Sequence, residues 1–152
     1  MRHLVTFCFA LYFSSGFLQA QSSPPTLSST QAIVTDTNCA IIPYQPDCYW
    51  IFKNVQATTL SEREIQVVDS IYTYCKNDHR DELIKHANYK RQYVPVINNK
   101  GEKEVWVNCF CDYESDWQKR IVIVFDGGKC FFNLKINITK KEYYDFGTNG
   151  EG

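Results

Sequence analysis

The stretch YVPVINNKGEKEVWVNCFC, residues 93–111, decides the fold. It contains two apolar runs, and the turn between them consists of Asn98, Asn99, Lys100 and Gly101. Two such runs joined by a turn of this composition are typical of a β-hairpin. Successive side chains of a strand point to opposite faces, so one face of the second run carries Val105, Val107, Cys109 and Cys111. We expect this face, with both thiols, to be directed towards a covering helix.

Two further strands are predicted after this hairpin. Residues 121–125 form a short apolar run, and residues 130–138 alternate between apolar and polar side chains. Gly127 and Gly128 lie between the two runs, where a tight turn requires residues that accept a positive φ angle. Residues 144–152 are interpreted as a tail or a short edge piece.

One clear helix is predicted before the hairpin. Ser61 and Glu64 form the S-x-x-E pattern of a capping box. The apolar residues that follow recur at helical spacing, and one face carries Ile65, Val68, Ile71, Tyr72 and Cys75. We expect this helix to end near Asn77, and a second, short helical turn to cover residues 81–86. The predicted fold class is α+β, with one main helix packed on a four-stranded antiparallel meander.

The first twenty residues have the layout of a secretory signal. Arg2 and His3 precede an apolar run that starts at Leu4, and small residues lead to Ala20, after which we expect cleavage. The apolar run is shorter than the ~20 residues that a spanning helix needs. We therefore expect a secreted or periplasmic protein with no membrane span after signal removal.

The rest of the chain is predicted to form one domain. Residues 21–38 are rich in Ser, Thr and Pro and lack apolar periodicity, which is typical of a flexible lead-in. Residues 39–152 then form a single α+β domain. Signal removal takes one of the 16 basic residues and none of the 17 acidic ones, which leaves a net charge of −2. This near-neutral balance argues against nucleic-acid binding, because such binding draws its affinity from neutralised phosphates.

Six cysteines remain after signal removal: Cys39, Cys48, Cys75, Cys109, Cys111 and Cys130. An even number of cysteines in an exported chain favours two or three disulfides. The turn-rich segment between Cys39 and Cys48 favours a local bridge. The helix face that meets the sheet favours a bridge from Cys75 to Cys109 or Cys111. A set of reduced thiols and a zinc site are the alternatives.

The histidines are the candidates for catalysis. His79 and His86 are the only two that remain after signal removal, and imidazole suits proton transfer near neutral pH. A metal site needs three or four converging ligands, whereas the charged stretch around these histidines is typical of a solvated connector. The D-G-G-K sequence at 126–129 leads into a strand, so it predicts a turn rather than a phosphate loop. We expect no catalytic residue, no metal and no cofactor.

Aromatic side chains on the outward face of the sheet form a candidate binding patch. Trp106 and Phe110 share this face of the second run, and Phe131 is a neighbour on the last predicted strand. If they are left uncovered, they form a partner-binding surface, and coverage by the tail or the lead-in is the favoured alternative. Asn137 begins an N-glycosylation sequon, Asn-Ile-Thr, and is expected on the same wet face.

Two resemblances extend these expectations. The stretch from Tyr89 to Cys111, together with Trp117, the run IVIVFDGGKCFFNLKIN and a closing NG, resembles a group of small uncharacterised exported proteins of Bacteroidetes-type bacteria. This resemblance covers roughly residues 60–150. It implies the same fold and export, and it implies no activity.

The second resemblance is to cystatin, which also places a helix before antiparallel strands. Residues 92–96, QYVPV, nearly match the QxVxG hairpin wedge of that family. The resemblance implies a protease-inhibiting wedge at Gln92, Tyr93 and Val94. Val96 departs from the pattern, because it occupies the position of the glycine that lets the wedge approach a protease.

The leading hypothesis is an exported, disulfide-bonded binding or structural module without catalytic activity. Its partner is an unknown protein or surface ligand. The alternatives are a cystatin-like protease inhibitor and an enzyme that uses His79 or His86.

Overall fold

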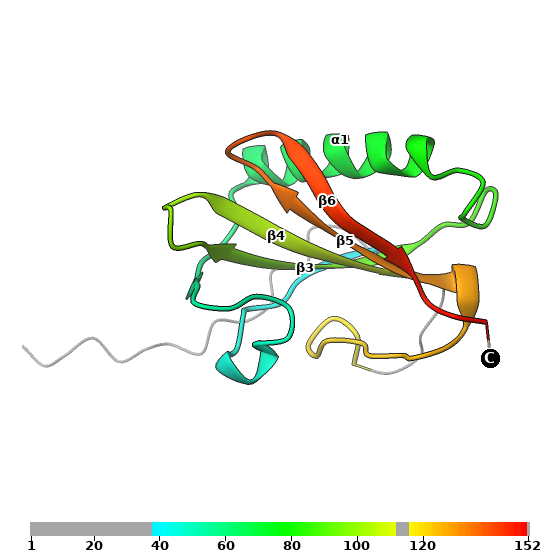
Figure 1. The fold of residues 1–152 in the computed structure, drawn as a ribbon, viewed down its shortest axis with the longest axis horizontal. Helices are drawn as coiled ribbons and strands as arrows, with labels where there is room; N and C mark the ends of the chain where they lie inside the picture. The colour runs from blue at the N-terminus through cyan, green and yellow to red at the C-terminus, as the bar shows by residue number, and fades with distance from the viewer. Residues whose placement is uncertain (1–37, 112–115, 152) are drawn as a thin grey trace, which may run out of the picture.

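The computed structural model describes residues 38–111 and 116–151 (Figure 1). The strands of this part are β1 (Cys39–Ile41), β2 (Gln56–Ala57), β3 (Lys90–Ile97), β4 (Lys103–Phe110), β5 (Phe131–Asn137) and β6 (Glu142–Thr148). The described residues also form one α-helix, α1 (Glu62–Asp78), and two short 3-10 helices, η1 (Pro46–Cys48) and η2 (Gly128–Cys130). The predicted signal peptide and residues 21–37 of the predicted lead-in lie outside the described residues.

The strands form one mixed sheet in the order β1-β3-β4-β5-β6, and β2 pairs with the end of β3. Strands β3 to β6 form an antiparallel meander, whereas β1 runs parallel to β3. The α+β class and the single main helix are confirmed. The sheet has six strands rather than the expected four, because β1 and β2 are too short to show an alternating pattern in the sequence.

The central hairpin is confirmed. Strands β3 and β4 pair along their whole length, with Tyr93 opposite Val107. In the turn, the side-chain oxygen of Asn98 accepts hydrogen bonds from the backbone amides of Lys100 (2.9 Å) and Glu102 (3.0 Å). An asparagine that caps its own turn in this way is a strong local signal, and it explains why the hairpin is predictable from sequence.

The predicted strand over residues 121–125 is wrong. These residues form a loop, and β5 pairs directly with β4. The fourth strand of the meander is β6, which lies where a tail or a short edge piece is expected from the sequence. Asp145 in β6 has a φ of 50°, and the pairing with β5 shifts between Asn133 and Lys135. This bulge interrupts the alternation by which a strand is recognised.

Helix α1 begins at the predicted capping box. The Ser61 hydroxyl accepts a hydrogen bond from the Glu64 amide (3.4 Å), and the Glu64 carboxylate accepts one from the Ser61 amide (2.8 Å). The buried face of the helix holds Val68, Tyr72 and Cys75. The second helical turn predicted over residues 81–86 is wrong, because this segment forms turns and His86 has a φ of 64°.

The sheet separates two hydrophobic cores. The helix-side core lies between the sheet and α1, and its strand residues include Val105, Val107, Cys109, Phe132, Leu134 and Ile136. The loop-side core lies on the other face of the sheet, and it includes Ile42, Phe52, Val94, Trp106, Phe110, Trp117 and Val122. Figure 1 shows α1 on one side of the sheet and the two loops that carry these covering residues on the other.

Candidate functional site

Two loops cover the sheet face opposite α1 (Figure 1). We call residues 42–55 the first loop and residues 116–127 the second loop. Each loop places some side chains in the loop-side core and leaves others in solvent. Four large apolar side chains of these loops are exposed, and together they define what we call the loop face: Tyr49, Trp50, Ile123 and Phe125.

Aromatic packing holds the first loop. Ile51 and Phe52 are buried against the sheet, and the Tyr44 hydroxyl donates a hydrogen bond to the carbonyl oxygen of Phe52 at 3.0 Å. The Trp50 ring meets the buried Trp106 ring edge-on, with centroids 5.4 Å apart. Aromatic pairs favour this geometry. One side of Trp50 is thus fixed to the sheet, while the residue remains 48% exposed.

A buried glutamine holds the second loop. Gln92 of β3 has no exposed surface, and its amide nitrogen donates hydrogen bonds to the carbonyl oxygens of Trp117 and Arg120. Its amide oxygen accepts one from the Val122 amide at 2.9 Å. Asn108 on β4 donates to the Gln92 amide oxygen (3.0 Å) and to the Val122 carbonyl oxygen (2.8 Å). These bonds satisfy backbone groups that burial would otherwise leave without partners.

The end of the second loop is tied to the C-terminal segment and to η2. Asn149 donates hydrogen bonds from its side-chain nitrogen to the carbonyl oxygens of Val124 (2.6 Å) and Asp126 (3.0 Å). A disulfide joins Cys111, which follows β4, to Cys130, which precedes β5. The bridge closes the base of the segment that carries the second loop.

Ile123 and Phe125 project from this tied loop. Phe125 is 92% exposed and Ile123 is 53% exposed. Their neighbours Val122 and Val124 make the hydrogen bonds described above, so the backbone on either side of Ile123 is fixed. Large apolar side chains gathered on fixed loops are what a partner-binding surface presents.

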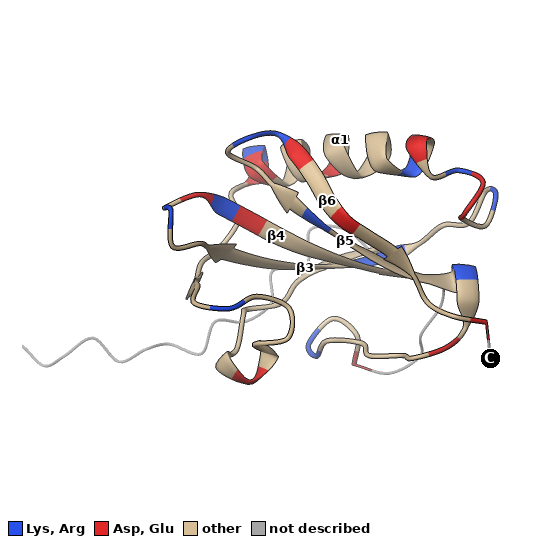
Figure 2. Cartoon of the chain, in the orientation of Figure 1, with Lys and Arg blue, Asp and Glu red and all other residues tan. Residues whose placement is uncertain are grey.

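The charge around the loop face is mixed. Figure 2 shows basic residues at the tip of the second loop and acidic residues at its two ends. The basic residues are Lys119 and Arg120, and the acidic ones are Asp116 and Asp126. Asp116 and Arg120 pair at 3.5 Å. This part of the surface therefore has no field of a single sign.

The predicted aromatic patch is corrected by the burial of its members. Trp106 and Phe110 are buried, and Phe131 is only partly exposed. Residues of the first and second loops pack with them in the loop-side core. The aromatic surface on this side of the sheet is therefore formed by the loops and not by the strands.

The predicted wedge is corrected as well. Gln92, Tyr93 and Val94 are fully buried, because β3 is a central strand between β1 and β4 and both faces of the sheet are covered there. Tyr93 belongs to the helix-side core, where its hydroxyl donates a hydrogen bond to Asp69 of α1. The residues that the cystatin resemblance marks as a wedge thus connect the sheet to its two covers.

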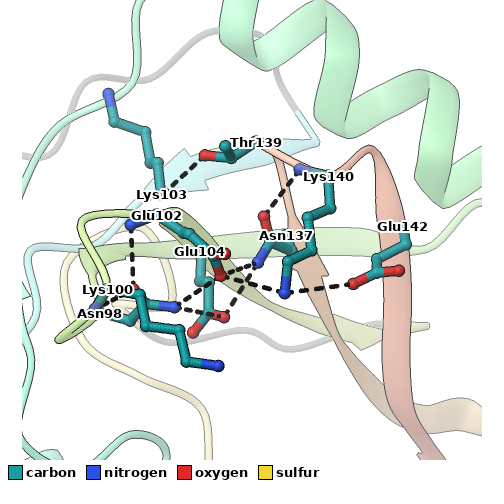
Figure 3. A network of polar contacts seen from close by, with 9 residues as sticks. All are labelled: Asn98, Lys100, Glu102, Lys103, Glu104, Asn137, Thr139, Lys140 and Glu142. Atoms are coloured by element: carbon teal, nitrogen blue, oxygen red, sulfur yellow. Dashed lines mark hydrogen bonds and ion pairs between the residues drawn. The ribbon is translucent and has the colours of Figure 1, made fainter.

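A polar network lies at one end of the sheet and joins the β3–β4 turn to the β5–β6 turn (Figure 3). Asn137 donates hydrogen bonds from its side-chain nitrogen to the carboxylates of Glu102 (2.9 Å) and Glu104 (3.3 Å). Asn98 donates to the same two carboxylates. Hydrogen bonds from Asn98 and Asn137 hold the pKa of Glu102 below its ordinary value. The prediction that Asn137 lies on a wet face is wrong, because the residue is 2% exposed and its sequon nitrogen is occupied.

The cysteines pair differently from the prediction. Among the described residues, Cys111–Cys130 is the only disulfide. Cys39 lies in the helix-side core, whereas Cys48 packs beside the loop-side core, so the sheet separates the two residues expected to form a local bridge. Cys111 is engaged by Cys130 because the two face each other where the β4–β5 ladder is extended, with the Cys111 amide 3.0 Å from the Cys130 carbonyl oxygen.

Cys75 and Cys109 are buried thiols of the helix-side core, so the bridge predicted from Cys75 is not formed. Burial raises the pKa of Cys75 to about 12 and raises that of Cys109 well above its usual value. Burial and the neighbouring Asp47 also raise the pKa of the half-buried Cys48. Because the thiolate is the reactive form, these three residues are poor nucleophiles at neutral pH.

The two histidines lie at the end of α1 and on the connection that follows it. His86 is exposed. The Nδ1 atom of His79 is 2.7 Å from a carboxylate oxygen of Glu82, and its ring stacks on Phe146 of β6 with centroids 3.7 Å apart. These contacts give His79 a structural environment at the junction of α1 and β6.

An open groove of about 350 Å³ lies beside this junction, between α1 and the start of β6. It is lined by Ser70, Ile71, Tyr74, Lys141, Glu142 and Tyr143. The Tyr143 hydroxyl donates a hydrogen bond to Asp78 at 2.7 Å, and the Tyr143 ring meets Tyr74 edge-on. The hydrogen bond to Asp78 raises the pKa of Tyr143 to about 12, so the phenol is protonated at neutral pH. Neither histidine lines the groove.

Comparisons with family models, curated proteins and solved structures find no match to this chain. Among residues 38–111 and 116–151, no group of three His, Cys, Asp or Glu side chains is arranged to hold a metal ion. No helix of this part of the chain is long and apolar enough to cross a membrane.

Only part of the loop face can be recognised in the sequence. In the run 121–125, Val122 is buried while Ile123 and Phe125 are exposed, so the alternation of a half-buried segment is present even though no strand forms. Tyr49 and Trp50 follow a turn-rich segment that carries no periodic pattern. Their exposure depends on the fit of the first loop to Trp106, which lies far away in the sequence.

Proposed function

We propose that this protein is an exported, disulfide-bonded binding module without catalytic activity, which captures a partner protein through its loop face. The observation that carries the proposal is the exposure of Phe125 on a loop whose backbone is hydrogen-bonded to Gln92, Asn108 and Asn149. A surface that is already held in one conformation loses little conformational entropy when it binds, and this favours affinity.

A protein is the partner class that the chemistry of the loop face fits. Tyr, Trp and Phe are enriched in protein interfaces, where a few of them supply most of the binding free energy. Nucleic acid would require a basic surface, whereas Asp116 and Asp126 accompany Lys119 and Arg120 on the second loop. The mixed charge around the apolar side chains resembles the polar rim of an interface.

The enzyme and inhibitor alternatives find less support. An acid–base enzyme would place His79 or His86 beside a pocket that receives substrate, but the groove between α1 and β6 is lined by neither. A cystatin-like inhibitor would present residues 92–96 at a free surface. Gln92, Tyr93 and Val94 instead anchor the covers of the sheet.

Export is tested by the N-terminus of the protein that leaves the cytoplasm. If the signal layout is correct, N-terminal sequencing of the secreted or periplasmic product starts at or within a few residues of Gln21. An intact Met1 chain recovered from membranes would contradict the export part of the proposal.

Partner capture is tested with the Ile123→Ser/Phe125→Ser double variant. The immobilised wild-type domain selects partners from the exported fraction. Each partner is then purified, and calorimetry measures its affinity for the wild type and for the double variant. Loss of two central apolar contacts weakens binding roughly 10- to 100-fold while the melting temperature stays unchanged. Tyr74→Ser, on the opposite side of the sheet, is the control and keeps wild-type affinity. Equal affinity of the double variant and the wild type overturns the proposal.

A further inference from the structure

The outer edge of β6 is a surface that the proposed function does not use. Within residues 38–111 and 116–151, β6 pairs with β5 and with no other strand. An edge strand presents backbone amide and carbonyl groups to solvent, and an extended chain can pair with them. Glu142 and Asp145 are exposed, and Tyr143 and Tyr144 are half-buried.

The groove between α1 and β6 borders the start of this edge. Ile71 and Tyr74 form its helix wall, and Lys141, Glu142 and Tyr143 form its strand wall. Figure 1 shows the start of β6 beside α1, from which the strand then runs away at an angle. A strand that adds to β6 would therefore direct every second side chain either into this groove or away from it.

The walls of the groove are already in place. Tyr143 is held by its hydrogen bond to Asp78, and its ring packs on Tyr74 with centroids 6.3 Å apart. Tyr74 is 63% exposed and lines the groove. A pocket with an aliphatic and two aromatic walls is suited to an apolar side chain.

Lys141 supplies a charge at the entrance of the groove. Its neighbour Lys140 forms ion pairs with Glu102 (3.3 Å) and Glu142 (3.9 Å). Lys141 has no ion pair within the described part of the chain, and Figure 2 shows the basic tip of this β5–β6 turn. Its ammonium group is therefore open to an incoming carboxylate.

We propose that this groove binds an extended peptide, which adds to β6 as an antiparallel strand and places one apolar side chain against Ile71, Tyr74 and Tyr143. In the antiparallel direction the C-terminal end of the peptide arrives at the start of β6. There a terminal carboxylate or an acidic side chain meets Lys141. The unpaired edge of β6 thus complements the peptide backbone. The apolar pocket complements one side chain of the same peptide, and Lys141 complements its carboxylate.

The bulge in β6 limits the length of the pairing. Asp145 has a φ of 50°, and the register with β5 is irregular opposite Lys135. The regular part of the edge is therefore Glu142 to Tyr144. The inference does not rest on the proposed function, because the loop face lies on the other side of the sheet and each surface has its own variants.

The experiment uses the full mature protein and a synthetic library of random heptapeptides with free C-termini. The selected peptides should share an apolar residue followed by an acidic residue or the terminal carboxylate. Their affinity, measured by fluorescence anisotropy, should fall by about tenfold or more in Tyr74→Ala and by about fivefold in Lys141→Gln. Phe125→Ser and Lys100→Gln are the matched controls and should change the affinity by less than about twofold.

Amide chemical shifts locate the bound peptide independently of the variants. Addition of a selected peptide should shift the amide signals of residues 142–144 and leave those of the second loop in place. Tyr74 and Lys141 are exposed or lie in a turn, so thermal melting should confirm that both variants fold. The inference is overturned if no peptide is enriched, if selected peptides bind both variants like the wild type, or if the shifts fall outside β6 and α1.

Discussion

The two sides of the sheet are covered in different ways. On the helix side, α1 satisfies its own backbone hydrogen bonds and contributes the buried face of Val68, Tyr72 and Cys75. On the other side, the second loop has no such internal ladder, and its backbone groups bond to the side chains of Gln92, Asn108 and Asn149. A regular cover thus satisfies its own backbone groups, whereas an irregular cover needs polar side chains of other segments for this purpose.

The helix and the loops also differ in which side chains they expose. A helix that packs through one stripe directs its apolar residues inwards, and loops follow no such period. The second loop can therefore bury Trp117 and Val122 and still expose Ile123 and Phe125. The side of the sheet that is covered by irregular loops is therefore the one that presents the loop face.

The largest effect is expected from the core on the helix side. Phe132 is 1% exposed and packs on Tyr72, Tyr89 and Phe146. Phe132→Ala should lower the free energy of unfolding by about 3–5 kcal/mol, because it removes buried contacts and leaves a cavity. Urea denaturation measures this loss. Phe125→Ala, in solvent, is the control and should stay within about 0.5 kcal/mol of the wild type.

The next effect concerns the glutamine that holds the loop side. Gln92→Leu places an apolar side chain at this buried position and removes the hydrogen bonds to Trp117, Arg120 and Val122. We expect a loss of about 2–4 kcal/mol, because buried backbone groups are left without partners. Gln66→Leu on the exposed surface of α1 is the matched control. A variant at position 92 as stable as this control would show that the loop needs no polar anchor.

Removal of the disulfide should have a smaller effect. The Cys111→Ala/Cys130→Ala variant should be less stable by about 2–3 kcal/mol, because the unfolded chain regains the freedom of a closed loop. Calorimetry measures the change, and Cys48→Ala is the single-thiol control. An unchanged melting temperature would mean that Gln92 and Asn149 alone fix the second loop.

A pH-dependent effect is expected at the start of α1. Partial burial works to raise the pKa of Glu64, but hydrogen bonds from Lys103 (2.6 Å) and Ser61 outweigh it and hold the pKa below its ordinary value. The carboxylate therefore contributes stability above about pH 4.5, and this is lost as the pH falls through the lowered pKa. Glu64→Gln should lower stability by about 1 kcal/mol at pH 7 and flatten the decline below pH 4.5. A decline as steep as that of the wild type would contradict this role.

The smallest effect is a gain in stability at the β5–β6 turn. Lys141 has a φ of 60°, a region that glycine occupies without the steric penalty of a side chain. Lys141→Gly should therefore raise the free energy of unfolding by about 0.4–1 kcal/mol, as measured by thermal unfolding. Lys100→Gly, at a position without a positive φ, should not stabilise the protein.

The helix side and the loop side also differ in how well the sequence predicts them. The capping box at Ser61 and Glu64 and the turn at Asn98 are interactions between residues close in sequence, so the helix and the central hairpin could be predicted. The second loop depends on contacts across 25 to 30 positions from Gln92, and residues 121–125 are as apolar as a strand. Local patterns cannot show that the backbone of this segment bonds to the side chain of a distant glutamine instead of to a neighbouring strand.

The sequence predicts the composition of the candidate site but not its position. It predicts aromatic residues on the face opposite the helix, and this face does carry them. Trp106 and Phe110 are covered, however, because Trp50 and Trp117 pack on them from the two loops. Gln92 belongs to the wedge that the cystatin resemblance implies, whereas its zero exposure comes from the second loop, which bonds to its side chain.

The central claim is that Gln92 holds the second loop in one conformation, and amide hydrogen exchange at Val122 tests it most directly. The Val122 amide donates to the Gln92 side chain. In the wild type it should exchange as slowly as the amides of β4, and Gln92→Leu should accelerate its exchange by about 100-fold while α1 amides change much less. Exchange of the wild-type Val122 amide at the rate of an unstructured chain would contradict the account.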